Sequence, residues 1–245
     1  LAKKLNAINQ ERKNIQEQVQ DEVEYLIGRE VDLEEDRVIV LASENFHSGV
    51  VGIVASRIVE KYFRPVVLIA LEGSIGKGSG RSIPHFNLHR AFTDCASHLV
   101  QFGGHAFAAG LTIDKDNIDS FRNAMNEVGR RILSEENLVP EIFLDTPLKI
   151  SEINEALHKQ IALMEPFGAE NSSPVFLIKC VSISRLKRIG RGKAHVRFQA
   201  NQGNARIDAV GFNLAGELAS INVELDKVDL ACEFQVNDWN GRNKL

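Results

Sequence analysis

The sequence predicts an α/β domain followed by an all-β barrel. Between residues 37 and 133, apolar runs alternate with segments of helical periodicity, as in strands joined by helices. From residue 174 on, four short apolar segments follow one another with only one short helical piece among them. The 245 residues, 44% hydrophobic and 25% charged, suffice for two such domains and exclude a disordered or fibrous chain.

Residues 1–30 are predicted to form one amphipathic connector helix. Leu5, Ile8, Ile15 and Val19 are among the apolar residues that recur there at helical spacing. Because no capping residue precedes this helix, we interpret it as a connector from an upstream domain; a free-standing N-terminal helix is the alternative.

Residues 31–135 are predicted to form the α/β domain. Two unbroken apolar runs, at residues 37–42 and 66–71, are joined by a helical segment at residues 50–63, which indicates a parallel pair of strands buried on both faces. The rest of the domain is expected as a glycine-rich loop at 73–82, a helix at 88–102 with Asn87 as its N-cap, a strand at 111–113 and a helix at 118–133.

Residues 136–173 are expected to be a linker that contains a helix near 152–164, and residues 174–245 to be the barrel. Four or five short strands and one small helix fit a partly open Greek-key barrel of the OB type. The expected strands are 175–184, 194–200, 205–212 and 228–236, with a helical piece at 214–220 and a last strand cut off near residue 245.

Cysteine usage and hydropathy suggest a cytoplasmic protein. Cys95, Cys180 and Cys232 are far apart and form no C-x-x-C pair, which argues against a zinc site or a disulfide framework. We expect all three to be reduced and buried. No apolar run approaches the roughly 20 residues that span a bilayer.

Two glycine-rich segments are candidate phosphate sites. In the first, residues 73–82, the spacing matches neither a Walker A loop nor G-x-G-x-x-G, which leaves a flexible loop that presents Arg81 with the hydroxyls of Ser79 and Ser82. An arginine can hold a phosphate through two parallel hydrogen bonds. A mobile hairpin with a solvated arginine is the alternative.

The second segment is Gly-Gly-His-Ala-Phe-Ala-Ala-Gly at residues 103–110. A helix C-cap explains Gly103, but not the glycine, histidine and small residues that follow. Small side chains let a ligand approach the main chain, and adjacent bare amides bind anions. His105 can donate to a phosphate, or act on a reacting one, so we favour a functional over a structural role.

This segment resembles the signature of the accessory domain that follows the catalytic domain in DHH-family phosphoesterases. Residues 47–57, 78–82 and 101–105 together are more similar to the RecJ exonuclease family than to the small oligonucleotide phosphodiesterases. Residues 164–168 and 237–241 resemble the RecJ linker and OB domain, so the resemblance covers nearly the whole chain. One departure is Glu170, where a second glycine is expected in a linker turn.

The segment from Arg185 to Arg206 contains seven Lys or Arg and no acid, in a chain of net charge −4. Such a concentration of positive charge favours an anionic partner over a merely solvated face. The segment lies at the first strand of the predicted barrel and the turn after it, and OB folds commonly bind single-stranded nucleic acid around these strands and loops. Among the aromatic residues, Phe198 is more consistent with barrel core, whereas Trp239 is equally consistent with base stacking. The predicted DNA-binding residues are Arg185, Lys187, Arg188, Arg191, Lys193, Arg197 and Trp239.

The resemblance implies hydrolysis of single-stranded DNA from the 5′ end, in DNA repair and recombination. In that family, Mn²⁺ or Mg²⁺ is bound by Asp and His clusters of an upstream domain; no Asp-His-His motif occurs here, so we expect no metal site in this chain, which alone should be inactive. The α/β domain would then clamp the terminal nucleotides, with His105 as the catalytic candidate, through Ser79, Gly80, Arg81, Ser82, Gly103, Gly104 and His105.

Single-stranded DNA is thus the expected partner, with a single-strand-binding protein or replication and repair proteins as further candidates; we expect a monomer. Two alternatives stay open at this point. One is a non-catalytic adaptor that binds single strands or a replication partner. The other is a phosphodiesterase of short oligonucleotides or cyclic dinucleotides, which shares the accessory domain but usually not the barrel.

Overall fold

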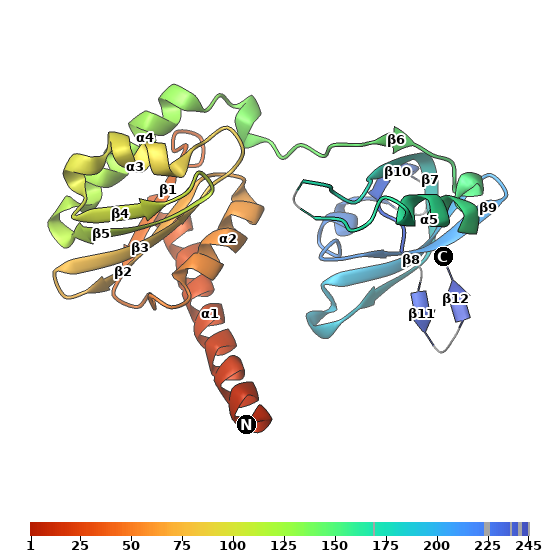
Figure 1. Ribbon diagram of the computed structural model, residues 1–245, viewed down its shortest axis with the longest axis horizontal. Helices are drawn as coiled ribbons and strands as arrows, with labels where there is room; N and C mark the ends of the chain where they lie inside the picture. Colours follow the sequence, from red (N-terminus) through yellow and green to blue (C-terminus); the bar gives the residue numbers. More distant parts are fainter. Residues whose placement is uncertain (169, 223–225, 236, 240–241, 245) are drawn as a thin grey trace. The chain divides into compact units, whose positions relative to one another are not determined.

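A computed structural model describes the chain except for residues 169, 223–225, 236, 240–241 and 245 (Figure 1). The chain divides into two compact units, Leu1–Pro140 and Glu141–Leu245. The first unit is α/β and the second is built of strands, so the predicted fold class is confirmed. Among the described residues, none of the helices has the length and hydrophobicity of a membrane-spanning segment.

The first unit contains a five-stranded mixed sheet of order β1-β2-β3-β5-β4. Strands β1 and β2 are parallel and joined by helix α2, as predicted, and every other neighbouring pair is antiparallel. The elements of this sheet are β1 (Ile39–Ser43), α2 (Val51–Tyr62), β2 (Val66–Glu72), β3 (Ile75–Arg81), β4 (Gln101–Gly104) and β5 (Ala108–Asp114).

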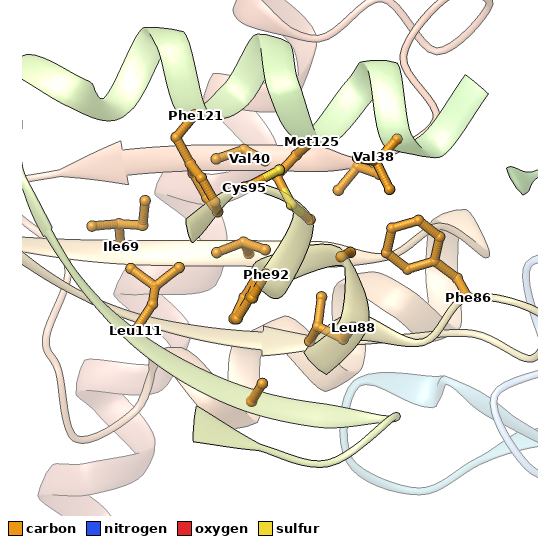
Figure 2. Close-up of a cluster of buried hydrophobic side chains, with 14 of the residues drawn as sticks. Val38, Val40, Ile69, Phe86, Leu88, Phe92, Cys95, Leu111, Phe121 and Met125 are labelled. Carbon is orange, nitrogen blue, oxygen red and sulfur yellow. The ribbon is translucent and has the colours of Figure 1, made fainter. Parts of the chain in front are cut away.

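Helices cover both faces of this sheet, each over its own hydrophobic cluster. Helices α1 (Ala2–Glu30) and α2 pack on one face, where the buried residues of α1 include Val19 and Val23. Helices α3 (Leu88–Asp94) and α4 (Ile118–Ile132) pack on the other; Figure 2 shows Phe92 of α3 and Phe121 of α4 in that cluster.

Two asparagine side chains fix helices of this unit, one as a cap and one by joining a helix to the sheet. Asn87 caps α3 as predicted, because its Oδ1 accepts from the Arg90 amide at 3.0 Å. Asn126 is buried in α4, where its Oδ1 accepts from the amides of Arg37 and Val38 and its Nδ2 donates to the Val38 carbonyl. These bonds satisfy backbone groups just before β1 and join α4 to the sheet.

Three expectations for the first unit were wrong. The glycine-rich loop at 73–82 is mostly strand β3, the helix expected at 88–102 ends at Asp94, and the segment 103–110 belongs to the β4–β5 hairpin. Glycine is usually depleted in strands, but here Gly76, Gly78 and Gly80 make room for large core side chains. A Cβ on Gly80 would lie 2.6 Å from Leu88 Cδ2.

In the second unit, a sheet of order β10-β7-β8-β9 is extended by β6, which pairs in parallel with β7. The helices expected near 152–164 and at 214–220 are both shorter than predicted. Cys180, which was expected to be buried, is exposed. The elements are β6 (Thr146–Pro147), α5 (Glu155–Ala162), β7 (Phe176–Ile189), β8 (His195–Gln202), β9 (Ala205–Gly211), the 3₁₀ turn Glu217–Ser220, β10 (Val228–Cys232), β11 (Asn237–Trp239) and β12 (Arg242–Lys244).

Strand β7 is shared between two halves of this unit. Its first half pairs with β10 and β6, and its second half pairs with β8. Between them Cys180 and Arg185 have positive φ values of 55°, and the register with β8 shifts between Ser184 and Lys187. Such bulges bend a strand, which lets one strand serve both halves around a common core. Phe198, 6% exposed, lies in this core, as favoured from the sequence.

Candidate functional site

Strand β3 presents different chemistry on its two faces. Gly80 is buried and faces Leu88 and Phe92 of the core. Its neighbours Ser79 and Arg81 alternate to the opposite face, beside α2. A Cβ on Gly52 of α2 would lie 2.9 Å from Arg81 Nη2 and 3.0 Å from Ser79 Oγ. Because Gly52 has no side chain, the Arg81 guanidinium and the Ser79 hydroxyl can pack against the first turn of α2.

The guanidinium of Arg81 is held but not neutralised. Its Nη1 donates to Ser79 Oγ at 3.1 Å and to the Gly80 carbonyl at 2.7 Å. The side chain is half-buried, and no carboxylate within the described ranges forms an ion pair with it. A positioned arginine with an uncompensated charge suits an anionic ligand.

Next to Ser79, two exposed glycines leave part of the sheet surface without side chains. Ser79 is the cross-strand partner of Gly110, which is in turn the partner of Gly103, so the three residues share one face. A Cβ at Gly103 would meet nothing within 4 Å, and one at Gly110 only the Gly78 carbonyl at 3.6 Å. Both glycines are exposed. We call this surface, with Ser79 and Arg81 at its side, the glycine floor.

The turn between β4 and β5 lies at the end of the glycine floor and carries His105. The Ser82 amide donates to the Phe107 carbonyl at 3.0 Å, and the Leu88 amide donates to the Ala106 carbonyl at 2.8 Å. These bonds fix the turn against the end of β3 and the start of α3. The imidazole of His105 is exposed. Arg81 is the cross-strand partner of Ala108, whose carbonyl accepts from the His105 amide, so strand β5 lies between Arg81 and the backbone of His105.

The expected nest of adjacent bare amides is wrong. The His105 amide donates to the Ala108 carbonyl at 2.8 Å and closes the hairpin. Gly104 has a φ of +143°, and a Cβ there would lie 2.4 Å from the Ala108 carbonyl oxygen, so glycine is needed for the turn itself. Ser82 also has an internal role, since its hydroxyl donates to the Phe86 carbonyl at 2.7 Å. Of the predicted residues, Ser79, Arg81, Gly103 and the side chain of His105 have no such role in the turn, and Gly103 and His105 are exposed.

The second unit presents cations on the outer face of strands β7, β8 and β9. Lys187 is the partner of Arg197, and Arg197 is the partner of Val210, so all three point away from the core. Arg206 of β9 is exposed on the same face. One acid accompanies them, because Arg197 Nη2 lies 3.5 Å from Asp208 Oδ2. Folding thus adds a carboxylate that the acid-free sequence window did not contain.

The remaining predicted cations are placed differently. Arg188 is the partner of the buried Val196 and donates to the Ala215 carbonyl at 3.3 Å, so it belongs to the other side of the strand. Arg185 is exposed at the bulge, and Lys193 is exposed in the turn after β7. The side chains of Arg191 and Trp239 lie outside the described part of the structure.

The described residues contain no group of three or more His, Cys, Asp or Glu side chains that could hold a metal ion. Mg²⁺ and Mn²⁺ need several such oxygen or nitrogen ligands. The residues present therefore do not fit a catalytic metal centre within the described ranges.

Two family models match the chain. One is described as the DHHA1 domain and matches residues 35–130, and the other is described as the RecJ OB domain and matches residues 144–245. The glycine floor thus lies in the DHHA1 domain and the outer cation face in the OB domain.

Curated relatives and solved structures agree with both models. The single-stranded-DNA-specific exonuclease RecJ of Bacillus subtilis is 32% identical over all of this chain and 31% of its own length. That of Escherichia coli is 30% identical over all of this chain and 43% of its own length. The crystal structure of Thermus thermophilus RecJ in complex with Mg²⁺ matches 98% of the chain and 35% of its own, with a TM-score of 0.76 and 28% identity. The chain thus spans less than half the length of these relatives, and it belongs to the RecJ family, of which it carries the DHHA1 and OB domains.

Proposed function

We propose that this chain is the substrate-binding part of an exonuclease that degrades single-stranded DNA in the 5′→3′ direction during DNA repair and recombination. The observation that carries the proposal is the glycine floor, an open surface beside an arginine that no described carboxylate neutralises. The two curated relatives, both named single-stranded-DNA-specific exonucleases, supply the substrate class. A cytoplasmic location and protein partners of the replication and repair machinery stay predictions.

The DHHA1 domain would clamp the terminal nucleotides. Arg81 offers the two parallel donors that a phosphate accepts, and its bonds to Ser79 and Gly80 hold it in place. The bare surface at Gly103 lets a sugar or phosphate approach the backbone without a steric clash. His105, fixed at the end of this surface, would donate to a phosphate oxygen near the scissile bond. Gly80, Gly104 and Ser82 would support this clamp through packing and turn geometry.

The OB domain would hold the incoming strand by charge. Lys187 and Arg197 lie side by side on the outer face, and Arg185 and Lys193 are exposed near them in the chain. Each neutralised phosphate releases condensed counterions, so affinity should fall steeply with salt. Arg191 and Trp239 remain predicted binding residues, whereas Arg188, predicted with them, lies on the other side of β7 and should contribute less.

The catalytic metals would be held outside this sequence. Thermus thermophilus RecJ has been solved in complex with Mg²⁺ and with Mn²⁺, whereas the described residues here offer no donor set for either ion. Such ions supply charge stabilisation and an activated water when bound. The residues of this chain would bind and orient the strand, and we therefore expect the chain alone, given Mn²⁺, to leave single-stranded DNA intact.

The decisive experiment replaces Arg81 in the intact RecJ-type protein that carries this chain. Arg81→Ala should lower the rate of degradation of single-stranded DNA about 100-fold, the typical loss when one positioned donor to a reacting group is removed. Arg131→Ala is the matched control, because Arg131 pairs with the exposed Asp94 on the opposite face of the sheet. Wild-type rates for Arg81→Ala, or hydrolysis by the chain alone, would contradict the proposed division of labour.

A further inference from the structure

Phe212 is a large aromatic side chain exposed to solvent immediately after β9. It is 70% exposed, and its neighbour on the same face, Val210, is 48% exposed. The alternate residues of β9 face inward, where Ala209 packs against the core and Gly211 is buried. Phe212 therefore contributes nothing to the core of the barrel, although its ring is among the most costly groups to hydrate.

The orientation of the Phe212 ring is nevertheless fixed by a neighbour. The ring of His195 meets it in an edge-to-face contact, with centroids 5.5 Å apart and planes inclined by 72°. The imidazole is itself held, because its Nδ1 accepts from the Asn213 amide at 3.0 Å. On its other side lies Gly190, at φ +83°, where a Cβ would come within 2.5 Å of His195 Cδ2. The aromatic pair is thus pre-organised on the surface.

Cations lie in the adjoining row of the same face. Val210, two residues before Phe212, is the cross-strand partner of Arg197, which is in turn the partner of Lys187. His195 precedes Arg197 by two residues and shares its face. An exposed ring beside a row of positive charge is complementary to a single strand, whose unpaired bases stack while its phosphates meet cations. A purely apolar protein ligand would offer these cations no anion, and in the described part of the structure Arg197 has a carboxylate nearby, Asp208 Oδ2 at 3.5 Å.

We propose that Phe212 is a platform on which one base of a bound DNA single strand stacks, with His195 and Gly190 as its positioning residues. Lys187 and Arg197 contact the phosphates of the neighbouring nucleotides. This inference rests on the proposed function and assigns base contacts to a residue outside the basic sequence window. It also explains why Phe212 remains exposed, because the face of its ring is covered only when DNA is bound.

The test compares two oligonucleotides with equal numbers of phosphates, one oligothymidine and one entirely abasic, each of about 15 nucleotides, a length that fills an OB site. Binding to the 245-residue chain is followed by fluorescence anisotropy. Phe212→Ala should weaken oligothymidine binding about 10-fold, within the range for loss of one stacked base, and leave abasic binding unchanged. Phe212→Trp should retain the wild-type preference for bases.

Matched variants separate this inference from the proposed function. Phe143→Ala removes another aromatic of the second unit, 82% exposed, and should change neither affinity. Lys187→Glu with Arg197→Glu should weaken both oligonucleotides alike. If that happens while Phe212→Ala has no base-dependent effect, the stacking platform is wrong and the charged DNA-binding face still stands. If charge reversal has no effect on either oligonucleotide, the proposed DNA-binding role of the face itself is wrong.

The positioning role of His195 has its own measurement. His195→Ala should lose the preference for bases in the same way as Phe212→Ala, because the Phe212 ring is then free to turn. His195→Phe should restore most of it by returning a ring to the edge-to-face contact. An equal loss in both variants would show that His195 acts otherwise than by orienting Phe212.

Discussion

Strands β3 and β7 both stand out in the sequence for glycine or basic residues, yet they are built in opposite ways. Strand β3 is regular, lies in the middle of its sheet and turns its glycines toward core side chains. Strand β7 is long, bulged and shared between two halves of its unit. In both strands, neighbouring residues lie on opposite faces: Arg81 lies beside α2 while Gly80 faces the core, and Lys187 lies on the outer face while the exposed Arg188 lies on the side of Val196.

The largest expected effect tests whether the β3 glycines serve packing or ligand binding. Gly80→Val should destabilise the first unit by about 3 kcal/mol, because the new side chain overlaps Leu88 and Phe92. Gly103→Val should cost less than about 0.5 kcal/mol, since its Cβ meets nothing within 4 Å. Urea unfolding followed by the helical circular dichroism signal measures both. Similar losses of stability at the two positions would contradict the assignment of Gly80 to a packed face and Gly103 to an open one.

The elements of the first unit that follow from local chemistry were predictable. The parallel pair follows from two unbroken apolar runs around a crossover helix, and the α3 cap follows from Asn87. Strand β3 was not predictable, because the room that its glycines leave is filled by Ile69, Leu88 and Leu111, residues distant in sequence or on other elements. The glycines can be read from the sequence, but the large side chains that pack against them can be identified only in the folded structure.

For the candidate site, the sequence identified residue types better than their orientation. Arg81 and His105 were found from their glycine-rich surroundings, whereas the role of Gly52 beside Arg81 appears only when α2 is packed on β3. In the OB domain, a bulge between Ser184 and Lys187 changes which basic residues face outward. Simple alternation along the sequence could not anticipate that shift. Phe212 was missed because it lies beyond the basic window.

Charge reversal on either face of β7 tests whether the outer face alone binds DNA. Lys187→Glu with Arg197→Glu should weaken single-stranded DNA binding about 10-fold or more and reduce the salt slope by about 1.4, as expected for two lost phosphate contacts. Arg188→Glu changes the charge of an adjacent residue on the other side of the strand, where it donates to the Ala215 carbonyl. Its effect on the salt slope should be smaller. Anisotropy titrations across a salt series measure the salt slope of each variant. An equal effect of Arg188→Glu would mean that alternation does not define the binding face.

The smallest expected effect concerns a polar contact within the first unit that neither surface uses. Glu24 of α1 accepts from Lys61 Nζ and from the Tyr62 hydroxyl of α2, both at 2.6 Å. Burial raises the pKa of Glu24, but the hydrogen bonds from Lys61 and then Tyr62 outweigh it, so the pKa is lowered. The stabilisation is therefore present above the unfolded pKa of about 4.3 and is lost as pH falls through the lower folded value.

Glu24→Gln should accordingly cost about 0.5 kcal/mol at neutral pH, a small value because the group remains accessible to water and its ion pair is screened. The difference between wild type and variant should shrink as the pH falls below about 4. Thermal unfolding across a pH series measures it, with Glu60→Gln, an exposed position on the same α2 helix, as the control. A cost that persists unchanged in acid would mean that Glu24 joins α1 to α2 through packing rather than through its charge.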